Sequence, residues 1–390
     1  MTVELRKAAE TIIWNGDAHQ LEQLLVVYKD DPFVKQWDEA LKVHSKEPAG
    51  FYERACTIIA YKHYFNEWSS FEKFKEEIKK EDNVVALFEK AADAVVAGNI
   101  AILNQSLKVN PALIHARSVR NHHATLLNYV GANGVEDFRQ KTPSNAVEVA
   151  EILLKAGAAV DAMGDMYRGT TTLGLVATSI HPLKAGLQKE LIDVLLKYGA
   201  DINHAVAPDY TDGLLINACL HNGRGEIVAY LAEKGAALDL EGAAGAGIPD
   251  EVKKYYDENG ALKKQAGIIK RDLGFMWACC YGHKTVVEFM LEKGFHLSTL
   301  ADGMTALHAA VMGGHIDIIK LLLDRKAPLE IKNCYGGTVL GQALWSAYND
   351  PKPQYPQIID MLLEAGAHVE PGWEKYIDEI KTREHKTSKE

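Results

Sequence analysis

The residues of this chain that could do acid–base chemistry are few, and His123, Asp165 and Glu241 are the weak catalytic candidates. His123 and Asp165 fall in turns between predicted helices, where a carboxylate more often accepts backbone N–H bonds than it takes part in catalysis. Glu241 occupies an inward-leaning position of a short predicted helix. A buried carboxylate needs a partner or a raised pKa, and such groups concentrate at functional sites, although structural ion pairs give the same signature.

No standard catalytic signature supports these candidates. The chain has no Gly-x-Ser-x-Gly elbow, no Walker phosphate loop and no His-Glu-x-x-His motif. Gly242, Gly245 and Gly247 imitate a glycine-rich loop, but no predicted strand precedes them, so they favour the tight packing of a short helix pair. The five cysteines show no metal-ligand spacing. We therefore expect no metal site and no cofactor.

The elements that must position these residues recur along the chain. Thr305-Ala-Leu-His308 begins a short predicted helix that closes at Gly314, and the next copy begins at Thr338, 33 residues after Thr305. In five copies a second predicted helix ends in glycine, which suits a left-handed C-cap. These endings lie at Gly157, Gly199, Gly235, Gly294 and Gly366.

The two markers recur in phase and resemble the ankyrin-repeat family. The resemblance implies an all-α solenoid of helix pairs with β-turn fingers, built from about seven or eight diverged units over residues 86–370. It also implies a structural role for His308, whose imidazole would bond the neighbouring turn. As a whole the chain resembles bacterial ankyrin-repeat proteins of unassigned activity.

The two ends of the chain depart from the repeat pattern. Residues 1–85 show helical periodicity without the full pattern, and we interpret them as an N-terminal helical cap that seals the first repeat. Residues 371–390 are predicted to form a C-terminal helix and a charged tail.

Positions on the outward stripe of each first helix, with the turns before them, are expected to line a concave groove. Aromatic residues at helical spacing are more often core than contact, so the alternative of a buried role stays open for the tryptophans. The expected ligand-binding residues are Tyr129, Asn133, Tyr167, Arg168, Asn217, His221, Trp277, Tyr281, Gln342 and Trp345.

Composition limits the partners and the compartment. The formal net charge is −10 and no long basic run occurs, which disfavours nucleic acid and anionic membranes as partners. No apolar stretch approaches the eighteen residues of a membrane span, and no signal-peptide core opens the chain. Scattered cysteines suit a reducing compartment. We expect a cytoplasmic protein.

Two functions fit these observations. The first is an interaction protein that presents a rigid concave groove to a protein segment or a small molecule. The alternative is an enzyme that acts on a small polar substrate, such as a carbohydrate, at a site built in the same groove. A deep pocket holding two of the ionisable candidates would favour the enzyme, and an open face would favour the interaction protein.

Overall fold

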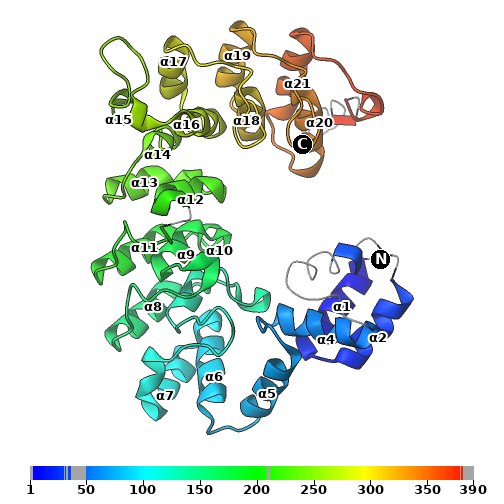
Figure 1. Cartoon of the computed structure of the whole chain (residues 1–390), viewed down its shortest axis with the longest axis vertical. Coiled ribbons are helices and arrows are strands. Elements are labelled where there is room, and N and C mark those ends of the chain that lie inside the picture. Colours follow the sequence, from blue (N-terminus) through cyan, green and yellow to red (C-terminus); the bar gives the residue numbers. More distant parts are fainter. Residues whose placement is uncertain are drawn as a thin grey trace, which may run out of the picture. The chain divides into compact units, whose positions relative to one another are not determined.

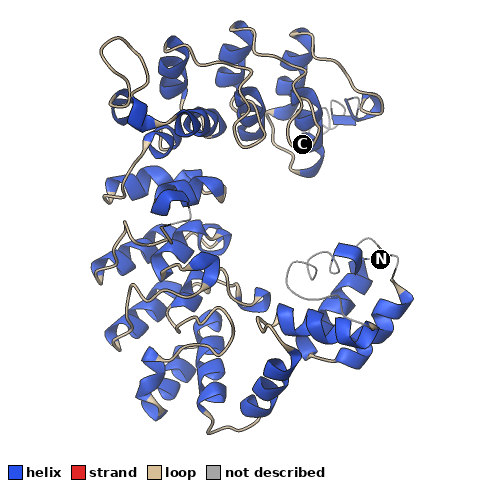
Figure 2. Ribbon diagram, in the orientation of Figure 1, coloured by secondary structure: helices blue, strands red, loops and turns tan. Residues whose placement is uncertain are grey.

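The computed structural model describes residues 3–29, 31, 34–36, 50–208, 211–377 and 379–380. Within these ranges the chain forms helices and turns, and the only β-structure consists of isolated bridges in the loops, such as Gly164 with Thr170 and Ala301 with Met304 (Figure 2). The structure divides into two compact units, Met1–Gly213 and Leu214–Glu390. Each unit is described by itself.

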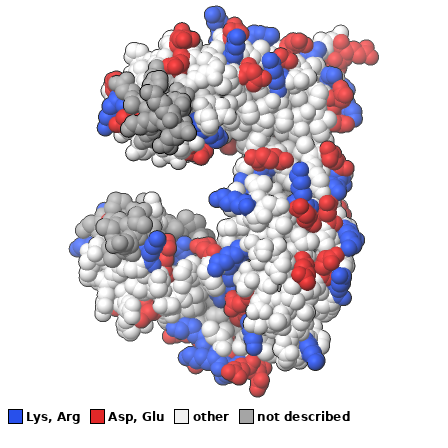
Figure 3. All heavy atoms as spheres, turned by 180° about the vertical axis from the view of Figure 1, so that it is seen from behind, with Lys and Arg blue, Asp and Glu red and all other residues white. Residues whose placement is uncertain are grey.

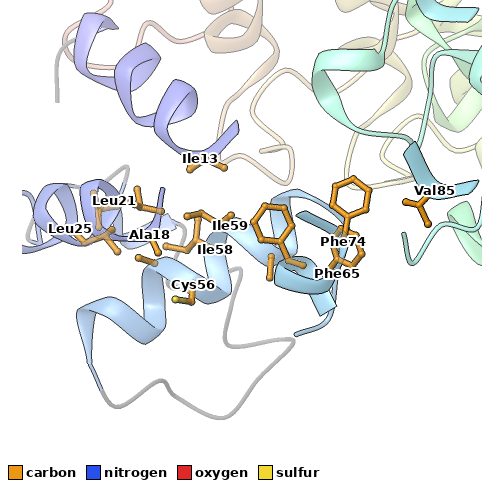
Figure 4. Close-up of a cluster of buried hydrophobic side chains, with 14 residues drawn as sticks. Ile13, Ala18, Leu21, Leu25, Cys56, Ile58, Ile59, Phe65, Phe74 and Val85 are labelled. Atoms are coloured by element: carbon orange, nitrogen blue, oxygen red, sulfur yellow. The ribbon is translucent and has the colours of Figure 1, made fainter. Parts of the chain in front are cut away.

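Four described helices precede the repeats and enclose a core of their own. Their apolar faces meet in a cluster that includes Ile13, Leu21, Ile59 and Phe74, with Val85 joining from the first repeat (Figure 4). Their bounds are α1 (Val3–Asn15), α2 (Ala18–Val27), α4 (Phe51–Lys62) and α5 (Trp68–Ile78). That residues 1–85 act as a cap remains a proposal.

The rest of the first unit consists of helix pairs joined by loops (Figure 1). One pair has only the short 3-10 helix η2 where a regular first helix is expected. In chain order the helices are α6 (Val84–Ala97), α7 (Ile100–Val109), η1 (Pro111–His115), η2 (Asn128–Gly131), η3 (Asp137–Arg139), α8 (Ala146–Lys155), η4 (Met166–Arg168), α9 (Thr172–Thr178), α10 (Ile180–Lys184) and α11 (Gln188–Lys197).

The second unit continues the pattern of helix pairs. First helices pack on first helices, as α14 does on α16, and second helices pack on second helices, as α17 does on α19. The short 3-10 helix η5 (Thr211–Gly213) ends the first unit. The helices of the second unit are α12 (Leu215–His221), η6 (Gly225–Ile227), α13 (Val228–Glu233), α14 (Leu240–Gly245), α15 (Pro249–Lys253), η7 (Lys264–Ala266), α16 (Ile268–Cys280), α17 (Lys284–Glu292), α18 (Ala306–Gly313), α19 (Ile316–Asp324), α20 (Val339–Asn349) and α21 (Tyr355–Glu364).

The repeat markers act as helix signals. The side chains of Thr171, Thr305 and Thr338 cap α9, α18 and α20 by accepting a hydrogen bond from the backbone N–H three residues later. Gly314 ends α18 in the left-handed conformation, at φ +80°. This conformation strains residues that have a Cβ, which explains why glycine recurs there.

The C-terminal residues, the surface charge and the length of the helices complete the description of the fold. Residues 374–377 are helical, whereas the predicted charged tail at residues 381–390 lies outside the described residues. On the face drawn in Figure 3, acidic and basic side chains are interspersed. A search of the described residues finds no helix with the length and apolar character needed to cross a membrane.

Candidate functional site

Small residues bring three first helices of the second unit close together. A Cβ added at Gly245 of α14 would lie 2.5 Å from Leu220 Cδ1 of α12. One added at Gly274 of α16 would lie 2.9 Å from Ala244 Cβ of α14. Neither distance is tolerated between carbon atoms, so glycine allows these helices to approach. Gly245 is one of the three glycines predicted to serve tight helix packing, and its close neighbour is the first helix of the preceding repeat, whereas Gly274 was not predicted.

Glu241 lies where α12, α14 and α16 meet and is fully buried. Its Oε1 accepts hydrogen bonds from His221 Nε2 at 2.8 Å and from Trp277 Nε1 at 3.0 Å. Its Oε2 accepts one from Lys270 Nζ at 2.9 Å. Three predicted site residues, His221, Glu241 and Trp277, are therefore in direct contact through one carboxylate.

A second carboxylate extends this group. Asp239 caps α14 by accepting a 2.8 Å hydrogen bond from Gly242 N. Its Oδ2 accepts another from Asn217 Nδ2 at 2.9 Å and lies 3.2 Å from Lys270 Nζ. Lys270 thus bridges the two carboxylates. We call the following residues the Glu241 cluster: Asn217, His221, Asp239, Glu241, Lys270 and Trp277.

The contacts of the cluster set its protonation. Burial by itself raises the pKa of Glu241, but the hydrogen bonds from His221 and Lys270 outweigh it and leave the pKa of that carboxyl below its ordinary value. The hydrogen bond to Glu241 raises the pKa of His221, against the opposing effect of burial. Glu241 is therefore a carboxylate that favours a protonated His221.

This arrangement limits the chemistry available to Glu241. A general acid needs a proton to give, and a general base needs a lone pair directed at the substrate. Glu241 has no proton at neutral pH, and both of its oxygens accept hydrogen bonds from within the protein. The partly exposed members are His221, Asp239 and Lys270, whose side chains are 30%, 23% and 23% exposed. The cluster joins three helices and presents two basic side chains and one carboxylate at its edge.

The indole of Trp277 does not line an open groove, because only 6% of the residue is exposed. Its ring lies edge-on to His221, with centroids 5.5 Å apart. Tyr281 follows one turn later, with its ring centroid 6.2 Å from that of Trp277. A Cβ at Gly225 would lie 2.2 Å from Tyr281 Cζ, so this phenol packs directly over the Gly225 backbone. Both aromatic rings pack against neighbouring residues, and Trp277 in addition donates its hydrogen bond to Glu241.

Gln342 and Trp345 lie one turn apart on α20 and differ in their surroundings. Gln342 Oε1 accepts a 2.8 Å hydrogen bond from Asn333 Nδ2, and its Nε2 donates to His308 O at 3.3 Å. The amide thus ties α20 to the turn before it and to α18 of the preceding repeat. Trp345 is 58% exposed, in contrast to Trp277.

In the first unit, Tyr129 is fully buried and does not face a groove. It lies in η2, a 3-10 helix, so the α-helical spacing that placed it outward does not apply. Its hydroxyl lies 3.5 Å from Glu136 Oε1, and the Arg139 guanidinium lies 5.6 Å from the centre of its ring.

The turns of the first unit bring the remaining predicted residues together in pairs. His123 Nδ1 lies 2.6 Å from Asp165 Oδ2, and both side chains are more than half exposed. Tyr167 donates a 2.7 Å hydrogen bond to Asn133 Oδ1. Arg168 is exposed and follows Tyr167 in a turn where both residues have positive φ.

No pattern in the sequence indicated the buried network of charges in this unit. Arg120 contacts both Glu89 and Glu136, and Arg139 Nη1 lies 2.7 Å from Glu89 Oε2 and 3.3 Å from Glu136 Oε1. All four residues are at most 7% exposed. They are separated along the chain by up to 50 residues and follow no local pattern. In the Glu241 cluster, Asp239 could have been found as a helix cap three residues before Gly242, whereas Lys270 had no signal.

Three histidines bond the scaffold, and for His308 the resemblance implied this role. His308 Nε2 lies 3.2 Å from Gly337 O in the next turn. His283 Nε2 donates to Gly245 O, and His315 Nε2 donates to Cys280 O, each at 2.9 Å. Among the residues that the structure describes, no group of three His, Cys, Asp or Glu side chains is placed to hold a metal ion.

Stacked helix pairs with capped first helices and glycine-closed ends define an all-α repeat protein of the solenoid class. The family model for ankyrin repeats matches residues 275–371 in three copies. Residues 275–371 are therefore ankyrin repeats.

Two curated proteins show similarity to parts of the chain. Transient receptor potential cation channel subfamily A member 1 of Homo sapiens is 25% identical over 248 residues, which cover 58% of this chain and 21% of that protein. Inhibitor of Bruton tyrosine kinase of Mus musculus is 32% identical over 105 residues, which cover 26% of this chain and 8% of that protein. The matches thus span about a fifth or less of these relatives.

Proposed function

We propose that this chain is an interaction protein that binds a segment of a protein partner on the outward face of its C-terminal repeats. Ankyrin repeats generally mediate interactions between proteins, and residues 275–371 match that family. The observation that carries the proposal is the exposure of Trp345, which leaves 58% of its surface in water on a first helix. Tryptophan and tyrosine bury much surface for little lost rotamer freedom, which makes them frequent hot spots of binding.

Further residues surround Trp345. Tyr348 lies three residues later on α20 and is 48% exposed, so its side chain shares a face with Trp345. Tyr335, 89% exposed, lies in the turn that Asn333 ties to Gln342. We call Tyr335, Gln342, Trp345 and Tyr348 the α20 patch. Its hydrogen-bonded turn and helix would bind with little loss of conformational entropy.

The enzyme alternative has less support. The His123–Asp165 pair is close enough for proton transfer, but its side chains are largely in solvent. Glu241 is buried and already accepts hydrogen bonds at both oxygens. A pocket of about 690 Å³ in the first unit is lined by none of these residues. The ionisable candidates therefore favour structural roles over a substrate pocket.

A peptide selection on the purified full chain tests the proposal. Peptides from a random phage library that bind the chain should lose about tenfold or more in affinity with Trp345→Ala and with Tyr335→Ala. Tyr61→Ala, at a tyrosine of α4 that is 43% exposed, is the matched control and should leave binding unchanged. Peptide binding that is insensitive to both α20 patch variants would contradict the proposal.

A thermal-shift screen of sugars and metabolites tests the alternative. A compound that stabilises the chain, and whose effect His221→Gln abolishes, would support a small-molecule site at the Glu241 cluster instead. His221 is the better residue to change, because Trp277 is buried and its removal would destabilise the fold.

A further inference from the structure

A pocket of about 690 Å³ lies in the first unit where the N-terminal helices meet the first repeat. Its lining comes from α1, α5, α6, the start of α7 and η3, together with the ends of neighbouring loops. No residue of the α20 patch or of the Glu241 cluster takes part. Its volume is within the range of protein sites that hold a ligand or the side chains of a partner.

The pocket has a closed apolar floor and an exposed apolar rim. Phe71 and Phe74 of α5 line it and are 2% and 5% exposed. Ile78, Ile102 and Phe138 also line it and are 40%, 38% and 38% exposed. Large apolar side chains gathered at an open pocket are typical of an interaction site, whereas single exposed ones need no explanation.

The charge at the pocket is opposite in sign to that of the whole chain. Of the lining residues five are basic and two are acidic, although the chain carries a net charge of −10. Arg120 and Arg139 are paired with carboxylates in the buried network. Lys75 Nζ donates to a backbone carbonyl, Gly16 O. Lys90 makes no hydrogen bond or ion pair within the described part of the chain.

We propose that this pocket is a second docking site, which takes a protein segment with one or two large apolar side chains flanked by aspartate or glutamate. The apolar side chains would fill the pocket, and the acidic residues would pair with Lys75 and Lys90. A free fatty acid or aromatic acid would fill the cavity but leave the rim residues in water, so a segment that also covers the rim fits better. The site goes beyond the proposed function and depends on no residue of the α20 patch.

The test uses the full chain and variants that fill the pocket or reverse its charge. Ala97 is exposed and lines the pocket, so Ala97→Trp blocks it. Ala101→Trp places the same side chain on an exposed position of α7 outside the pocket, as the matched control. The charge variant is Lys75→Glu with Lys90→Glu, and Lys108→Glu with Lys155→Glu is its control at exposed lysines elsewhere.

The probe is a random peptide library displayed on phage, selected on the native chain and counter-selected on Ala97→Trp. Recovered peptides should carry net negative charge and at least one large apolar residue. In fluorescence anisotropy they should lose about tenfold or more in affinity with Ala97→Trp and with the lysine pair, and less than about twofold with either control or with Trp345→Ala. Because Lys90 is exposed and Lys75 is only partly buried, their variant stays informative if Ala97→Trp fails to fold.

Three outcomes would overturn the proposal. Peptides that bind both Ala97→Trp and the lysine variant normally would place the docking site elsewhere. Recovered peptides without acidic residues would remove the charge argument. The third outcome is that no peptide binds at the pocket, whereas sodium oleate binds and loses affinity with both Ala97→Trp and the lysine variant. That result would assign the pocket to a free anionic amphiphile. Failure of the peptides that depend on Trp345 would bear only on the proposed function.

Discussion

His221 Nε2 donates a 2.8 Å hydrogen bond to Glu241 Oε1, joining the last residue of α12 to a fully buried carboxylate of α14. This contact gives the second unit a polar core between its first helices. Lys270 and Trp277 donate to the same carboxylate from α16. A carboxylate that accepts from two neighbouring helices fixes the orientation of the repeats as well as their spacing.

The His221–Glu241 contact predicts a pH-dependent contribution to stability. The folded-state pKa of His221 lies above its ordinary value of 6.5, so its contribution is complete below pH 6.5 and is lost as the pH rises through the raised value. The folded-state pKa of Glu241 lies below 4.5, so its contribution is lost only as the pH falls through that lowered value. Between about pH 5 and 6, His221→Gln should therefore cost about 1 kcal/mol.

Urea unfolding of the native chain and of His221→Gln at pH 5.5 and pH 8.5 measures this effect. The difference between their midpoints should shrink at the higher pH. His204→Gln serves as the control, because His204 pairs with Asp201 at the surface and is largely exposed. A difference that stayed constant between the two pH values would show that His221 is not charged in the folded protein.

Glycine at the helix contacts predicts opposite effects for two similar substitutions. Gly274→Ala would place a Cβ 2.9 Å from Ala244 Cβ and 3.0 Å from Leu240 O, and we expect a loss of about 1–3 kcal/mol. Gly341→Ala, also in a first helix, would meet its nearest atom, Thr338 Oγ1, at 3.4 Å. There the higher helix propensity of alanine should leave stability unchanged or raise it by up to about 1 kcal/mol. Equal effects in chemical denaturation would argue against close packing at α14.

The two tryptophans predicted for the groove should differ sharply when removed. Trp277→Ala deletes a buried indole and its hydrogen bond to Glu241, so we expect a loss of about 3–5 kcal/mol. Trp345→Ala removes a side chain that is largely in water and should change stability by less than about 0.5 kcal/mol. Thermal unfolding followed by circular dichroism compares them. A large loss with Trp345→Ala would assign it a structural role.

The sequence predicted the repeat scaffold because the scaffold depends on local signals. Thr305 and Thr338 cap their helices, and Gly314 ends one, through the conformational preferences of single residues. The repeat pattern placed Glu241 at an inward-leaning position, and the residue is fully buried.

The exposure of individual side chains on the outward stripe of the first helices was not predictable, because it depends on the contacts that the neighbouring repeat makes. Trp277 and Trp345 were predicted for equivalent surfaces, but Trp277 lies against Glu241 and His221 of the preceding repeats. Tyr129 was misplaced because its repeat has a 3-10 helix where the pattern implied an α-helix. Lys270 and the Arg120–Glu136 pair join residues from different elements, and no periodicity reports such contacts.

In the buried network of the first unit, the stability cost of removing Arg120 should depend on whether Glu136 is still present. Arg120→Met would leave the fully buried Glu136 with one guanidinium partner in place of two, and removal of one member of a buried ion pair costs about 3–5 kcal/mol. The double variant Arg120→Met with Glu136→Leu removes one charge of each sign, and Arg139 keeps Glu89 and Asp93 as partners. We expect the double variant to recover most of the lost stability. Lys155→Met, which breaks a surface pair with Glu151, should cost less than about 1 kcal/mol. The measurement is the urea midpoint of the native chain, Arg120→Met, the double variant and Lys155→Met. A double variant no more stable than Arg120→Met would mean that Arg120 stabilises the fold by packing on Phe74 and not by its charge.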